Sequence, residues 1–143
     1  MTVKRTLARK GSQVAIIAPD AKVDDAIARL DNNDVSALVV IDHTGIVGIV
    51  TSTDVIRGLR RYGTGAVQMR VETIMTRSVV TCDIGERMRR IYELMTRHQI
   101  RHVPITQNGI LCGLVTILDV VQHRVDEFEA EANHLRDYVA GAA

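Results

Sequence analysis

Aromatic residues are scarce in this sequence, and neither sign of charge is in clear excess. Its 143 residues include no Trp, three Tyr and one Phe, too few for a protein that binds single-stranded nucleic acid by stacking on the bases. The 18 basic residues are nearly matched by 17 acidic ones, whereas proteins that bind a phosphate backbone normally carry a strongly basic field. We therefore expect no nucleic-acid partner.

Long hydrophobic runs are absent as well. The longest apolar stretches have about five residues, as at 37–41, and a helix that spans a bilayer needs about 18. Residues 1–11 are basic but lack the apolar core and small-residue cleavage site that a secretory signal requires. The sequence therefore predicts a cytoplasmic protein with no membrane partner.

Cysteine is limited to Cys82 and Cys112, which are too few for a disulfide framework and share no metal-ligand spacing. The five histidines stand beside no cysteine cluster, so we expect no bound metal. The sequence has no GxSxG, P-loop or GxGxxG motif, and no set of nucleophile, base and orienting group can be assigned from residue spacing. We therefore expect neither enzymatic activity nor a catalytic cofactor.

What the sequence does contain is an internal repeat with an offset of 65 residues. Residues 48–56, GIVTSTDVI, recur at 113–121 as GLVTILDVV, with five of the nine positions identical. At the same offset, apolar positions with helical spacing in 23–30 match those in 88–95. The chain is therefore predicted to consist of two copies of one unit of about 60 residues.

Each copy predicts the order strand, helix, strand, strand, helix, which is an α/β (α+β) fold class. Apolar strands beside amphipathic helices imply a sheet covered by helices, and Asn, Asp and Gly between the last two strands predict a hairpin turn. One copy alone would bury too little surface, so the two copies are expected to pack together around a pseudo-two-fold axis. The expected elements before each second helix are 14–18, 22–33, 35–41 and 46–50, and then 79–81, 86–98, 100–105 and 110–115.

The repeat also predicts where the chain divides. We expect an N-terminal helical extension at 1–11, repeat 1 at 12–66, repeat 2 at 67–125 and a C-terminal helix extension at 126–143. Apolar residues in the last helix form a heptad seam with alternating spacings of four and three; they are Val121, Val125, Phe128, Ala132, Leu135 and Val139. A helix that covers its own core accounts for this seam only as far as about Phe128. Beyond that residue we expect contact with another subunit, and hence a homodimer.

The repeated segment carries a Gly-x-x-Thr-x-x-Asp motif that has two interpretations. Its copies are Gly48, Thr51 and Asp54, and then Gly113, Thr116 and Asp119. Locally, Thr-x-x-Asp at a strand-to-helix junction is a helix-capping box. Functionally, a helix N-terminus with a threonine hydroxyl favours a phosphate, the aspartate can accept both hydroxyls of a ribose, and the glycine leaves room for a ligand beside the strand. The second interpretation predicts nucleotide binding.

Together with its secondary markers, the paired motif resembles the CBS (cystathionine-β-synthase) domain family, whose domains occur in tandem. The markers are Pro19-Asp20-Ala21, Asp54-Val55-Ile56-Arg57 and Arg101-His102-Val103-Pro104, and the resemblance covers about residues 12–125. The resemblance implies a stand-alone CBS pair, a regulatory module of signal transduction. Its two clefts between the copies would bind AMP, ADP, ATP, NAD(H) or S-adenosylmethionine, and the ligand would change the packing of the repeats.

The resemblance also implies which residues form the ligand sites. Thr51 and Thr116 match the phosphate-binding threonines, and Asp54 and Asp119 match the aspartates that hold the ribose. The other matched positions are Arg101 and His102 beside phosphate, Pro104 in the same segment, the backbone near Ile17 and Val80 beside adenine, and Arg57 toward the tail of a dinucleotide. From the residues alone, Arg57 and Arg101 can also be interpreted as solvated surface charges. His102 can also be interpreted as a structural residue.

The two copies depart from the family pattern in different places. Opposite Arg101-His102 the first copy has Ser36-Ala37, and in place of the Pro-Asp-Ala opening the second copy has Cys82-Asp83-Ile84-Gly85. We therefore expect two unequal clefts, the tighter one built on Thr116, Asp119 and Arg101. The alternative function is a protein-interaction scaffold whose clefts stay empty, and the sequence names no effector protein for either function.

Overall fold

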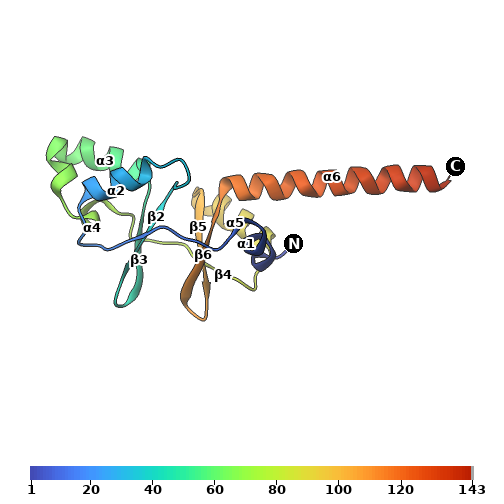
Figure 1. The fold of residues 1–143 in the computed structure, drawn as a ribbon, viewed down its shortest axis with the longest axis horizontal. Helices are drawn as coiled ribbons and strands as arrows, with labels where there is room; N and C mark the ends of the chain where they lie inside the picture. The colour runs from blue at the N-terminus through green and yellow to red at the C-terminus, as the bar shows by residue number, and fades with distance from the viewer. Residues whose placement is uncertain (143) are drawn as a thin grey trace.

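Two small sheets, each covered by helices, form the body of the protein, and a long helix extends from it (Figure 1). The computed structural model describes residues 1–142. The first half contains α1 (Val3–Lys10), β1 (Ile16–Ile17), α2 (Val23–Leu30), β2 (Leu38–Asp42), β3 (Gly45–Val50), α3 (Ser52–Tyr62), the 3₁₀ helix η1 (Gly63–Gln68) and α4 (Val71–Ile74). The second half contains β4 (Cys82–Asp83), α5 (Met88–His98), β5 (His102–Gln107), β6 (Ile110–Thr116) and α6 (Ile117–Ala142).

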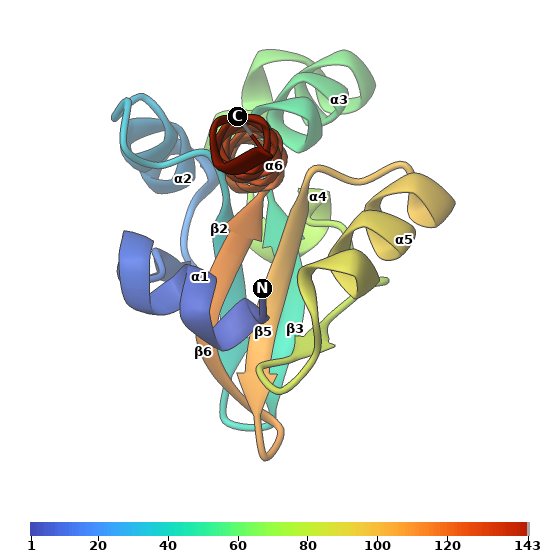
Figure 2. The same cartoon turned by 90° about the vertical axis from the view of Figure 1, so that its right-hand side faces the viewer.

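The two sheets have the same topology, as the repeat predicts. β1 pairs in parallel with β2, which pairs antiparallel with β3, and β4, β5 and β6 repeat this arrangement. The hairpin register shifts between Val40 and Ile41 in one sheet and between Ile105 and Thr106 in the other, which are equivalent positions of the repeat. Seen along α6, β5 and β6 lie in front of β3 and β2 (Figure 2). The α/β class and the tandem β-α-β-β-α order are therefore confirmed.

Each repeat has its own apolar core between its sheet and its helices. In repeat 1, the buried face of α2 packs against strand residues, among them Val23, Ala26, Leu38, Val40 and Val50. In repeat 2, α5 and the strands contribute Met88, Ile91, Leu94, Met95, Val103, Ile105 and Val115. The helical positions recur at spacings of three and four, which is the pattern of a helix that buries one face.

The segments that precede the repeats are exchanged between the two cores. α1 precedes repeat 1 in the sequence, yet its Val3 and Leu7 lie in the core of repeat 2. α4 lies at the start of the range predicted for repeat 2 and precedes its first strand, β4, yet Val71, Ile74 and the following Met75 lie in the core of repeat 1. Figure 1 shows the same exchange, with α1 beside β6 and α4 beside β3. Each repeat is thus closed by the segment that precedes the other, which fixes the repeats against each other.

The motif glycines make room for these exchanged segments. A Cβ atom at Gly113 would lie 2.6 Å from Leu7 Cδ1, and one at Gly48 would lie 2.8 Å from Met75 Cγ. Both separations are far shorter than the 3.5–4.0 Å or so of ordinary carbon contacts. This finding corrects the expectation that the glycines leave room for a ligand, because buried side chains of the cores fill that space.

The last helix, α6, has 26 residues and projects well beyond the body (Figure 1). Near its start, Val120 packs against the core of repeat 2, and His123 is only 6% exposed. Within residues 1–142, no helix combines the length and the hydropathy needed to cross a bilayer.

Replacing Gly113 with Ala should destabilise the fold, because the added methyl group collides with Leu7. We expect the free energy of unfolding, measured by urea denaturation, to fall by about 1–3 kcal/mol. Gly65→Ala is the matched control, since nothing lies within 4 Å of a Cβ at that position, and it should change stability by less than about 0.5 kcal/mol. In a Leu7→Ala background the effect of Gly113→Ala should shrink; an undiminished effect would contradict this contact.

Candidate ligand-binding site

Both Thr-x-x-Asp segments cap a helix. Thr51 stands immediately before α3, and its backbone N–H donates to Asp54 Oδ2 (2.9 Å). The equivalent bond joins the Thr116 N–H to Asp119 Oδ2 (2.8 Å) at the start of α6. The two threonine hydroxyls lie 3.4 and 3.1 Å from the same carboxylate oxygens. The local interpretation of the motif is therefore confirmed, and the cap uses only one oxygen of each carboxylate.

The second oxygen of Asp54 has two further hydrogen-bond donors. Asp54 Oδ1 accepts from the Thr76 hydroxyl (2.7 Å) and from the Arg57 guanidinium (3.1 Å). The aspartate is only 3% exposed, whereas the arginine side chain is 61% exposed. A ligand hydroxyl that binds this carboxylate must therefore replace or share a donor, and the exposed arginine can leave most easily because water can solvate it.

A cavity of about 580 Å³ brings the first motif together with the second repeat. Thr51, Asp54 and Arg57 line it from repeat 1, and Arg101 and His102 line it from repeat 2. Half of the predicted site residues thus share one cavity. It offers a hydroxyl, a carboxylate and two guanidinium groups in a space of the size that small-molecule sites usually have.

The imidazole of His102 spans the boundary between the repeats. Its Nε2 lies 3.1 Å from Ser36 Oγ of repeat 1. Burial lowers the pKa of His102, and the positive charges of Arg101 and Lys10 lower it further. The ring is therefore uncharged at neutral pH and serves as a hydrogen-bonding partner, so the positive charge on this side of the cavity comes from the arginine.

A second cavity, of about 630 Å³, is the symmetric counterpart of the first. Thr116 lines it from repeat 2, while Ser36 and Ala37 line it from repeat 1. These two residues are the equivalents of the Arg101-His102 pair at the offset of 65. Lys10 also lines this cavity, so its cation comes from α1.

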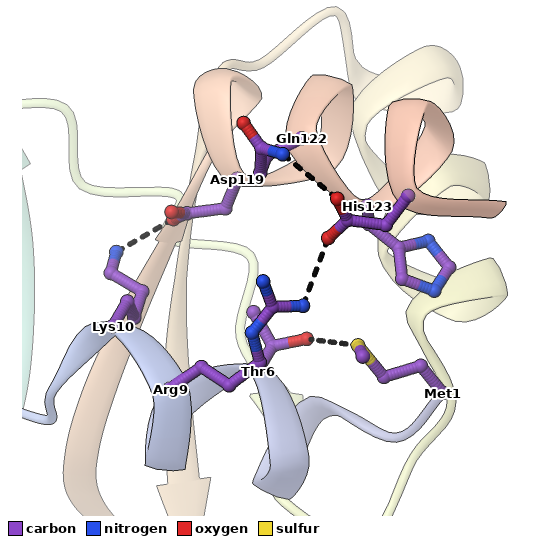
Figure 3. Close-up of a pocket in the computed structure, with 8 residues that line it drawn as sticks. Met1, Thr6, Arg9, Lys10, Asp119, Gln122 and His123 are labelled. Atoms are coloured by element: carbon purple, nitrogen blue, oxygen red, sulfur yellow. Dashed lines mark hydrogen bonds and ion pairs between the residues drawn. The ribbon is translucent and has the colours of Figure 1, made fainter. Parts of the chain in front are cut away.

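Lys10 holds the aspartate of the second motif. Its Nζ donates to Asp119 Oδ2 (2.6 Å) and to the Leu114 carbonyl (2.8 Å). Figure 3 shows Lys10 reaching from α1 toward Asp119 in the first turn of α6, with Arg9 beside it on α1. Arg9 forms an ion pair with Asp126 of α6 (2.9 Å). Within residues 1–142, no hydrogen bond reaches Asp119 Oδ1, and the side chain lines the cavity between α1 and α6 that Figure 3 shows.

The cleft expected on Thr116, Asp119 and Arg101 is not formed, because each cavity combines the motif of one repeat with the strand start of the other repeat. Arg101 lines the cavity of Thr51 instead. The pseudo-two-fold arrangement places the motif of one repeat opposite the strand start of the other, so that Thr116 shares its cavity with Ser36. The two clefts do differ in their lining residues, but the arginine belongs to the first cleft.

Four of the predicted residues lie outside both cavities. Asp119 instead lines the adjoining cavity between α1 and α6, together with Lys10. Ile17 is buried in the core of repeat 1, and Val80 packs against the core of repeat 2. Pro104 is buried in β5, where it pairs with Leu114 of β6. Their places beside a ligand remain predictions.

Thr76 and Lys10, which hold the two aspartates, were not predicted from the sequence. Thr76 also exchanges backbone hydrogen bonds with Ile49 (2.9 and 3.0 Å), and Ile49 is equivalent to Leu114, whose carbonyl accepts from Lys10. Extending the 65-residue offset upstream places Lys10 one residue before the equivalent of Thr76. A comparison of the segments that precede the repeats could therefore have indicated both residues.

Comparison with known proteins identifies the family. The family model of the CBS domain matches residues 7–61 and again residues 71–126, so the chain belongs to the CBS domain family. The crystal structure of the CBS-domain containing protein ATU1752 from Agrobacterium tumefaciens is 35% identical to this chain, with a TM-score of 0.80 over 86% of this chain and 92% of that one.

Two further relatives differ in how much of their length the chain covers. The mitochondrial CBS domain-containing protein CBSX3 of Arabidopsis thaliana is 32% identical over 127 residues, which is 85% of this chain and 62% of that protein. The CBS domain pair of protein MJ0100, solved in complex with 5′-methylthioadenosine and S-adenosyl-L-methionine, is 25% identical with a TM-score of 0.74 over 85% of this chain and 98% of that one.

Thr76→Val should destabilise repeat 1, because the buried carboxylate of Asp54 loses a hydroxyl donor. We expect thermal and urea denaturation to show a loss of about 1–2 kcal/mol. Thr73→Val is the matched control, since Thr73 is also exposed on the same segment and should change stability by less than about 0.5 kcal/mol. Equal effects of the two substitutions would show that the hydroxyl does not hold the aspartate.

Proposed function

We propose that this chain is a regulatory CBS-pair module that binds an adenosyl nucleotide and acts by binding, without catalysis. The observation that carries the proposal is the cavity shared by Thr51, Asp54 and Arg101. A hydroxyl at a helix N-terminus and a guanidinium suit a phosphate, and a carboxylate suits the ribose hydroxyls. The complex of the MJ0100 pair with two adenosyl compounds supports this class of ligand.

In the first cleft, the phosphate of AMP, ADP or ATP is proposed to bind Arg101 and the N-terminus of α3 at Thr51. The ribose hydroxyls bind Asp54 and displace Arg57 from its Oδ1 atom. The released arginine, which is largely exposed, can then turn toward a second phosphate of ADP, ATP or NAD(H). Two guanidinium groups favour these anionic ligands over the cationic sulfonium of S-adenosylmethionine.

The second cleft is proposed to bind the same class of ligand more weakly. Thr116 lines this cleft, and Asp119 of the same motif lies in the adjoining cavity, which shares Lys10 with the cleft. Ser36 and Ala37 supply no positive charge to the cleft. Its cation, Lys10, already pairs with the carboxylate, so a ligand must share that partner. The proposed order of affinities is therefore the reverse of the order expected from the sequence.

A ligand in the first cavity touches both repeats, and this contact is the proposed basis of regulation. Such a ligand can shift the packing of the repeats only by the difference in its affinity for two arrangements. We propose that this shift passes to an effector protein or across a homodimer. An interaction scaffold with empty clefts is the second candidate, because the exposed apolar residues of α6 suit protein binding with or without a nucleotide.

Arg101→Ala should weaken AMP binding at least about tenfold in calorimetry, because a charge-assisted bond to phosphate is lost. Binding of 5′-methylthioadenosine, which has no phosphate, should change by less than about threefold. Arg97→Ala, at an exposed position of α5 outside both cavities, removes the same charge and should change neither affinity.

An equal loss for both ligands would contradict the phosphate role of Arg101. A thermal-shift screen separates the two candidate functions, since a ligand at 100 times its Kd adds about 2.7 kcal/mol of stability. If AMP, ADP, ATP, NAD(H), S-adenosylmethionine and 5′-methylthioadenosine all leave the melting temperature unchanged, the scaffold function replaces nucleotide binding.

Asp119→Ala should remove the weaker of two AMP-binding events and leave the stronger one, because it deletes the ribose acceptor of the second cleft only. Titration calorimetry measures this as a fall in stoichiometry from about two to about one. Asp126→Ala is the control, since it breaks the neighbouring α1–α6 ion pair with Arg9 but leaves the motif intact. Loss of the stronger event in the Asp119 variant would contradict the proposed order of affinities.

A further inference from the structure

One face of α6 is apolar and exposed along the length of the helix. Its residues recur at alternating spacings of three and four, and the structure adds Leu118 to the six predicted from the sequence. This seam consists of Leu118, Val121, Val125, Phe128, Ala132, Leu135 and Val139. Apart from Ala132, the exposed fractions range from 42% at Val125 to 75% at Leu118. A continuous exposed apolar strip of this kind marks an interaction surface.

The body of the protein packs against the opposite face of α6. His123, at 6% exposed, packs on α5, and Asp126 pairs with Arg9 of α1. In a heptad that starts with Leu118 at position a, these two residues occupy positions f and b. The seam therefore faces away from the body. Beyond Phe128, no hydrogen bond or ion pair found in residues 1–142 joins α6 to the body, and the helix projects from it (Figure 1).

Charged residues flank the seam in a pattern that complements a second copy of the same helix. Position g holds Arg124 and Glu131, and position e holds Glu129 and Arg136. In a parallel, in-register pair, a g residue of one helix faces the e residue five positions later in the other. Arg124 then faces Glu129 of the second copy, and Glu131 faces Arg136 of the second copy. Both kinds of pair join opposite charges.

We propose that α6 pairs in parallel and in register with α6 of a second copy of this chain, as a two-stranded coiled coil. The seam spans about three heptads, or about 32 Å of helix. Two of its four a positions hold β-branched Val125 and Val139, and the last d position holds Leu135, which is the pattern of two strands; Leu118 at a and Val121 at d depart from that pattern at the start of the seam. The proposal extends the homodimer proposed above to a defined surface, orientation and register. It does not depend on nucleotide binding.

Charge reversal tests the pairing. The native chain should sediment with twice the chain mass of 15.8 kDa. Arg136→Glu places a glutamate opposite Glu131 of the second copy, and Glu131→Arg places an arginine opposite Arg136 of the second copy. Each substitution should raise the dissociation constant of the dimer about tenfold. The double variant, Glu131→Arg with Arg136→Glu, should restore the dissociation constant of the native dimer. Asp137→Lys, at the outward f position, is the control for a charge change without a partner and should have no effect.

Disulfide formation tests the orientation. Val139→Cys should form a disulfide-linked dimer under mild oxidation, because a parallel pair brings the two 139 positions together. In an antiparallel pair, position 139 of one helix would lie opposite Val121 of the other. The two 139 positions would then be about 27 Å apart along the axis. Asp137→Cys is the control that should not cross-link, and the unmodified chain gives the background from the partly buried Cys112.

A native chain that sediments at 15.8 kDa at all concentrations, a double variant that fails to restore dimerisation, or a dimer that forms without the 139–139 cross-link would each overturn the proposal. AMP binding is measured on the same variants by thermal shift. Since the seam lies away from both cavities, loss of the dimer with AMP binding retained separates failure of this interface from failure of the proposed function.

Discussion

The contacts of Leu7 with Gly113 and of Met75 with Gly48 are the ones on which the relative position of the two repeats depends. Each brings the segment that precedes one repeat into the core of the other, so neither core is complete by itself. These segments also end beside the motif aspartates, where Thr76 and Lys10 hold them. Core packing and site geometry are therefore one constraint, since the segment that closes a core also supplies a partner of the carboxylate.

The two clefts share a geometry but differ in charge. In the first cleft, the neutral hydroxyl of Thr76 and the exposed guanidinium of Arg57 donate hydrogen bonds to Asp54. Arg101 adds a second guanidinium to this cleft. In the second, an ammonium group stands directly on the carboxylate of Asp119, and the position of the arginine is taken by serine. Two sites built from the same motif thus offer different charge to a ligand, because charge is set by residues outside the motif.

The sequence predicts those features of the fold that depend on local chemistry and on the periodicity of apolar residues. The strand order within one copy, the hairpins and the capping of helices at Thr51 and Thr116 follow from residues within about ten positions of one another. The offset of 65 then shows that the same order occurs twice. The crossed pairing of Arg101 with Thr51 does not, because an internal repeat identifies equivalent residues and says nothing of which ones become neighbours. The exchange of α1 and α4 has the same origin, and so does the failure to place Lys10 beside Asp119.

The same helix that begins at the second motif ends far outside the body. Asp119 lies in the first turn of α6, and no proline interrupts the 26 residues that follow the strand, so the helix is a stiff lever of about 39 Å. The pairs of Lys10 with Asp119 and of Arg9 with Asp126 hold the first turns of α6 to α1, and a rotation of about 5° of these turns as a unit would move the tip by about 3 Å. A small change in how α1 holds the helix would therefore be enlarged at its far end.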